Sequence, residues 1–141
     1  MALKEQLVPK VENIARLSDL FKIEFRSKST SLNSGVTDGS ISLTWQDIFK
    51  IVGPSFFKPS PPTMIKSSII GALYDLRRNL YEFTLFSTVE DVIKIQLVAY
   101  GFIKIFEAEA VGGAVSEFLQ LTDLGKRALI EIAAVRADAG V

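Results

Sequence analysis

The side chains that carry most protein chemistry are scarce in this chain of 141 residues. It contains no Cys and no His, which excludes thiol nucleophiles, disulfides, Cys-based zinc sites and His-based catalytic triads. The remaining catalytic candidates are carboxylates that are not paired at a spacing typical of an active site: Asp75, Asp91, Glu107 and Asp123. Gly112-Gly113 indicates a hairpin turn and not a phosphate-binding loop. We therefore expect no catalytic residue, no metal, no cofactor and no enzyme activity.

Residues suited to binding a partner lie on a helix that is predicted to begin near Ser60-Pro61. Its core side carries apolar residues at helical spacing: Ile65, Ile69, Ala72, Leu73, Leu76 and Leu80. Another side mixes bases with apolar residues: Lys66, Ile70, Tyr74, Arg77 and Arg78. Tyr and Arg are enriched at the energetic centres of interfaces. These five residues, with Lys94 from the next predicted helix, are the candidate contacts to a protein or to DNA. An N-terminal helix packed over the same surface would also explain it.

The charge of the chain argues against DNA as the partner. Lys and Arg number 16 and Asp and Glu number 16, whereas duplex-binding domains usually carry a basic surplus. A helical projection of residues 89–100 places four residues opposite the apolar arc: Glu90, Asp91, Lys94 and Val98. Only Lys94 among them is of a type that commonly reads bases. The predicted hairpin tip, from Glu107 to Gly113, is acidic and would repel phosphate. A local basic patch is the open alternative.

Residues 87–136 contain the elements that must position these side chains. Ser87 or Thr88 is expected to cap a helix that is apolar around most of its circumference, and such a helix is mostly buried. Gly101 ends it, and two strands at 102–106 and 118–121 flank the Gly112-Gly113 turn. Thr122 is expected to cap a last helix with a core stripe at helical spacing: Leu124, Ala128, Ile132 and Val135. Gly125 lies early in this helix, where close approach of another element would explain a glycine.

Shorter elements precede this stretch. Residues 1–20 form an amphipathic segment, which we interpret either as a linker helix from an upstream domain or as a helix docked on this domain. Residues 21–26 and 40–43 alternate as two strands of a hairpin around a loop at 27–39. Thr44 is expected to cap a helix that turns four apolar residues inward and stops at Gly53-Pro54: Trp45, Ile48, Phe49 and Val52. Residues 83–86 are predicted to be the first strand of the sheet formed with 102–106 and 118–121.

Three segments of the sequence are similar to segments of known protein families. Leu121-Thr122-Asp123-Leu124-Gly125-Lys126-Arg127-Ala128-Leu129, directly after a hairpin, resembles the ending of bacterial winged-helix domains in the multiple-antibiotic-resistance and phenolic-acid-regulator families. Together with residues 43–49 and 93–103, it resembles the C-terminal winged-helix module of uncharacterised bacterial multidomain signalling or defence proteins. This resemblance implies a winged helix-turn-helix without catalytic residues.

We therefore predict an α+β fold, a winged helix-turn-helix with an extra N-terminal β-hairpin and a short leading helix. The expected organisation is a leading segment at 1–20, the hairpin at 21–43, the winged-helix domain at 44–137 and a tail at 138–141. The expected function is a non-catalytic interaction module that binds a protein partner or a second copy of itself. The alternative is a DNA-binding regulator that uses Lys66, Arg77, Arg78 and Lys94. No signal sequence and no 18-residue apolar run occur, which predicts a cytoplasmic protein without a membrane contact.

Overall fold

The structure, a computed structural model, describes residues 14–31, 35–109 and 111–134. In chain order these residues form β1 (Leu20–Ser29), β2 (Thr37–Thr44), α2 (Trp45–Val52), the 3₁₀-helix η1 (Gly53–Phe56), α3 (Thr63–Leu76), β3 (Leu80–Leu85), α4 (Ser87–Ala99), β4 (Ile103–Glu109), β5 (Val115–Leu121) and α5 (Asp123–Ala133). The predicted α+β class is confirmed. Most of the predicted leading helix, together with Val135 and the tail at 138–141, lies outside the described residues. Residues 14–19 are described and are not helical.

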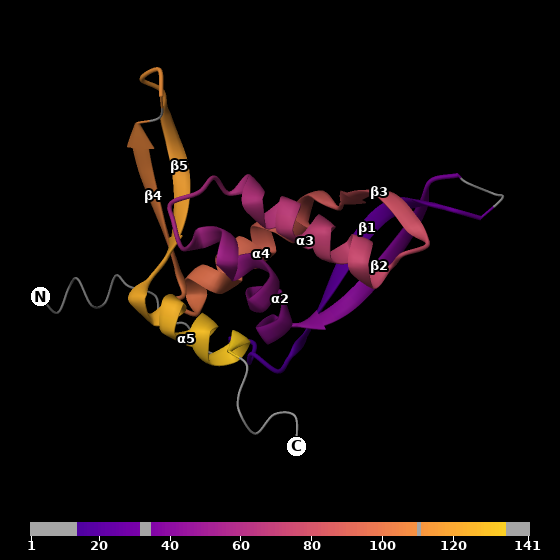
Figure 1. Cartoon of the computed structure of the whole chain (residues 1–141), viewed down its shortest axis with the longest axis horizontal. Helices are drawn as coiled ribbons and strands as arrows, with labels where there is room; N and C mark the ends of the chain where they lie inside the picture. Colours follow the sequence, from indigo (N-terminus) through magenta and orange to yellow (C-terminus); the bar gives the residue numbers. More distant parts are fainter. Residues whose placement is uncertain (1–13, 32–34, 110, 135–141) are drawn as a thin grey trace, which may run out of the picture.

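Two small antiparallel sheets lie at opposite ends of the molecule, with the helices between them (Figure 1). The larger sheet has the order β2-β1-β3, and the smaller one is the β4–β5 hairpin. Alternation along β1 buries Ile23 and Phe25 against the helices and turns Lys22 and Glu24 to solvent. The predicted N-terminal hairpin is confirmed, because β1 pairs with β2 in antiparallel register from Leu20 opposite Thr44 to Ser27 opposite Thr37. Its strands extend further into the expected loop than predicted, to Ser29 and from Thr37.

The prediction for residues 83–86 is wrong. Residues 83–85 belong to β3, which pairs with β1 and not with the β4–β5 hairpin, and Phe86 lies outside the strand. The buried side of β3 explains this pairing, because the Phe83 ring meets the Phe25 ring edge to face at 5.3 Å. The place beside β5 is taken instead by Ser60, which exchanges two backbone hydrogen bonds with Leu119, at 3.0 and 2.8 Å.

The helix α2 follows its prediction closely. The Thr44 hydroxyl accepts a hydrogen bond from the Asp47 amide at 3.1 Å, and the predicted inward residues are all buried: Trp45, Ile48, Phe49 and Val52. The helix α3 starts later than predicted, at Thr63, because Ser60 is held in the bridge to β5. Its buried residues are Ile65, Ile69 and Leu73, whereas Leu76 is exposed and Leu80 belongs to β3.

The start of α5 packs directly on Gly101 and Phe102, which connect α4 to β4. Thr122 caps α5 as predicted, accepting from the Gly125 amide at 2.9 Å, and its hydroxyl donates to the Gly101 carbonyl at 2.6 Å. Gly125 is buried against the backbone of Phe102, which is the close approach that its early position indicated. Ala128 and Ile132 of the predicted core stripe of α5 do pack against the core. Leu124 is exposed instead of buried, and Leu129, which was not predicted, is buried.

One residue separates the larger sheet from α4. Phe86 is the N-cap residue of α4, and neither Ser87 nor Thr88 caps the helix as predicted. The Phe86 amide donates to the Glu24 carbonyl of β1 at 3.1 Å. The Arg26 guanidinium lies over the Phe86 ring, 5.3 Å from its centroid. The beginning of α4 is thus attached directly to β1.

Candidate functional site

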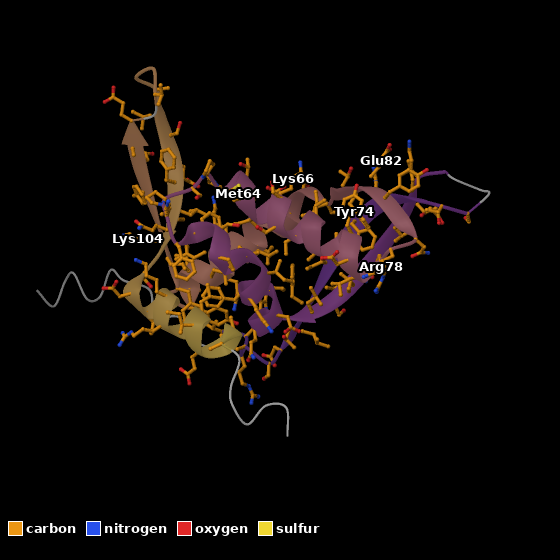
Figure 2. The ribbon with its side chains drawn as sticks, in the orientation of Figure 1. Met64, Lys66, Tyr74, Arg78, Glu82 and Lys104 are labelled. Carbon is orange, nitrogen blue, oxygen red and sulfur yellow. The ribbon has the colours of Figure 1, made fainter. Side chains whose placement is uncertain are left out.

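The predicted contact surface on α3 is only partly present. Lys66, Ile70 and Tyr74 lie along one side of the helix, as their spacing of four residues requires, but Ile70 is half-buried against the core. Arg77 is the C-cap residue of α3, half-buried, with its guanidinium bonded to the Leu76 carbonyl at 3.2 Å. Arg78 lies beyond the end of the helix, whose last residue, Leu76, is already roughly 15 Å from Lys66 along the axis. Figure 2 shows Lys66 and Arg78 well apart, so the bases do not form one patch.

Tyr74 is held in place by contacts within the chain. Its ring meets the Phe83 ring edge to face at 4.9 Å, and its hydroxyl accepts a hydrogen bond from the Glu82 amide at 3.1 Å (Figure 2). Glu82 has a φ of 51° and lies in a bulge, where β3 carries two residues opposite one residue of β1. Its carboxylate binds Lys28 at 2.9 Å, and this hydrogen bond and its charge raise the pKa of Lys28. Tyr74 therefore supports the bulge of β3.

Replacing Tyr74 with Phe should lower the free energy of unfolding by about 1 kcal/mol, because the Glu82 amide loses its acceptor while the ring contact is kept. Urea denaturation measures the change. Tyr81→Phe is the matched control, since the Tyr81 hydroxyl makes no hydrogen bond within the described part of the chain. Equal stabilities of the two variants would show that the bond to Glu82 contributes nothing.

Lys94 lies on α4 and is already paired. Its ammonium binds the Glu117 carboxylate of β5 at 3.1 Å, and its side chain is only 23% exposed. The bond attaches the middle of α4 to the β4–β5 hairpin. A lysine that is held in this way is a poor candidate for a DNA contact.

The sequence prediction found the exposed side of α4 only in part: it placed Asp91 and Val98 outward, and both are exposed, but it missed Val92 and Ile95. Only Val89, Ile93 and Leu97 are buried, so the helix is not mostly buried as expected. The side chain of Ile95 is 64% exposed, and Val92 and Val98 are 39% and 37% exposed. The exposed positions of α4 are Ser87, Thr88, Asp91, Val92, Ile95, Val98 and Ala99. They include no Lys, Arg, Asn or Gln. The helix that was projected as half acidic therefore presents an apolar stripe with one carboxylate.

The β4–β5 hairpin continues this apolar and acidic surface. Ile105 pairs with Leu119, and Glu107 pairs with Glu117, so that these four side chains share one face of the hairpin. Because Glu117 binds Lys94, this face is the one turned toward α4. Val98 lies one turn beyond Lys94 on the same side of α4 and therefore also turns toward the hairpin. Like Ile105, it is exposed. We call Asp91, Val92, Ile95, Val98, Ile105 and Glu107 the α4–hairpin surface.

The charge of this region is unlike that of the whole chain. The elements α4, β4 and β5 together contain five acids and two bases, a net charge of −3, although the chain is neutral. Glu107 and Glu117 lie directly opposite each other, and such like-charge pairs are destabilising. Lys94 neutralises Glu117, whereas Glu107 has no cation within 4 Å among the described residues. Within the described residues, the Glu107 carboxylate beside the apolar stripe is thus left without a counter-charge.

Comparisons with other proteins found no match. No protein-family model matches the chain, and no curated protein and no solved structure matches it. Within residues 14–31, 35–109 and 111–134, no helix has the length and apolar character needed to cross a membrane. The same residues contain no group of three or more carboxylates that could hold a metal ion.

Proposed function

We propose that this chain is a non-catalytic winged-helix module that acts by binding protein and not DNA. The observation that carries the proposal is the exposed side of α4. In a helix-turn-helix protein the second helix of the motif enters the major groove and reads bases through Arg, Lys, Asn or Gln. Here that helix exposes Val92, Ile95 and Val98 beside Asp91. Aliphatic side chains in such a stripe suit a protein surface.

The order of the elements supports the winged-helix part of the proposal. The helix α2, the bridge at Ser60, the helices α3 and α4, and the hairpin β4–β5 follow the order of helix, strand, two helices and two strands. The bridge joins Ser60 to β5, as the first strand of a winged helix joins its hairpin. One feature differs, because β3 lies between α3 and α4 where a helix-turn-helix has a short turn.

A duplex titration tests the proposal. A random-sequence duplex labelled with a fluorophore is added to the chain at low salt, and its anisotropy is followed. We expect no salt-sensitive binding, because the surface on α4 is acidic and the bases of α3 do not form one patch. Arg77→Glu with Arg78→Glu serves as the comparison and should give the same null result. Micromolar binding that weakens steeply with salt and is lost in this variant would overturn the proposal in favour of a DNA-binding regulator.

A further inference from the structure

We propose that the α4–hairpin surface binds an amphipathic helix of a partner protein, whose apolar stripe is flanked by Lys or Arg. This inference rests on the proposed function and names the chemistry of the partner. It uses the two properties that the surface combines, an exposed aliphatic stripe and uncompensated negative charge.

The aliphatic stripe sets the shape of the partner. Val92, Ile95 and Val98 are spaced by three residues along α4 and cover about 9 Å of its length. Helices that dock into grooves use anchors at the same kind of spacing, so that two or three of their apolar side chains can meet this stripe. Ile105 of the projecting hairpin adds a further aliphatic contact at its side. The site is thus bounded by a helix on one side and by a hairpin on the other.

The acidic groups set the charge of the partner. Asp91 on α4 and Glu107 on β4 are both exposed, and neither has a cation within 4 Å in the part of the chain that the structure describes. A lysine or arginine flanking the docked apolar stripe would supply the counter-charge that Glu107 lacks opposite Glu117. Complementary charge at the rim of an interface selects the partner and speeds association.

A second copy of this chain fits the surface less well. Two α4–hairpin surfaces placed face to face would bring two regions of charge −3 together. Four partly exposed aliphatic side chains also offer only a fraction of the ~800 Å² per partner that a stable interface buries. A basic helix avoids the repulsion and is small enough for the site.

The probe is a fluorescently labelled helical peptide with leucines on one face and lysines on the other. The same peptide with every lysine changed to glutamate is its counterpart. We expect the lysine peptide to bind the full chain at micromolar concentration and the glutamate peptide to bind at least about tenfold more weakly. Ile95→Ala should lower the affinity for the lysine peptide about tenfold. Glu107→Gln should lower this affinity severalfold and reduce its dependence on salt concentration.

Matched variants elsewhere on the chain locate the binding. Ile130, which is 59% exposed on α5, provides the aliphatic control as Ile130→Ala, and Glu24 on β1 provides the acidic control as Glu24→Gln. Neither should change the affinity for the lysine peptide.

Three outcomes would overturn this inference. They are no binding of the lysine peptide, binding that Ile95→Ala leaves unchanged, and self-association in sedimentation equilibrium that Ile95→Ala abolishes. Each can occur while the duplex titration stays negative, in which case the proposed protein-binding function survives. Salt-sensitive duplex binding would contradict the proposed protein-binding function itself.

Discussion

Replacing Gly125 with Ala should lower the free energy of unfolding by about 3 kcal/mol or more, the largest effect that we expect from adding a single methyl group. The added Cβ would collide with the Phe102 carbonyl oxygen and would lie 2.8 Å from its carbonyl carbon. These are backbone atoms, and the Phe102 carbonyl already accepts the Thr122 amide at 3.0 Å. The backbone at Phe102 and the start of α5 therefore cannot separate without losing that bond. Urea denaturation followed by circular dichroism measures the loss.

Gly71 supplies the control for this prediction. It lies inside α3, and no atom lies within 4 Å of the position that an added methyl group would take, so Gly71→Ala meets no clash. Replacing an unhindered helical glycine with Ala should raise stability by about 0.5–1 kcal/mol, because the unfolded chain loses conformational freedom. Opposite signs for the two Gly→Ala changes are the expected result. A Gly125→Ala variant as stable as the parent chain would show that the contact between α5 and the Phe102 backbone can open freely.

The second large effect on stability is expected from truncating a buried isoleucine of α4, whereas truncating an exposed one should have little effect. Ile93 is fully buried, and Ile93→Ala should cost about 2–5 kcal/mol through lost burial and the cavity left behind. Ile95, two residues further along, is exposed, and Ile95→Ala should change stability by less than about 0.5 kcal/mol. Urea midpoints of both variants measure the difference. A comparable loss at Ile95 would mean that residue 95 is part of the core, and the apolar surface on α4 would then have no basis.

The sequence predicts those features that depend on neighbouring residues. Thr44 and Thr122 cap their helices because a hydroxyl reaches an amide three residues ahead, and this geometry is local. Gly112 and Gly113 have positive φ values of 98° and 89° in the predicted hairpin turn. Gly125 was notable for its position alone, since a glycine early in a helix requires a reason.

Features that depend on distant residues could not be predicted in this way. Alternation in β3 indicates that one face is buried, but it does not indicate that Phe83 will meet Phe25 and not the hairpin. The partner strand lies more than fifty residues earlier in the chain.

The candidate site was missed for a related reason. Apolar residues surround α4, so a helical projection cannot tell which side faces the core. The actual direction is set by tertiary contacts, among them the bond from Lys94 to Glu117. One signal was available: a helix with one buried side leaves its other apolar residues exposed, and such residues mark an interface. On α3, spacing placed Lys66 and Tyr74 correctly but could not show that Tyr74 binds the Glu82 amide.

Because only Phe86 separates β3 from α4, the orientation of α4 and of its apolar surface is coupled to that of the larger sheet. A flexible connection would let α4 keep its orientation when the sheet moves, but Phe86 is fixed to β1 through its amide and its ring. A tilt of β1 would therefore act directly on the beginning of α4, because Phe86 is bonded to Glu24 and lies under Arg26. We therefore expect a tilt of β1 to change the direction in which α4 presents Val92 and Ile95.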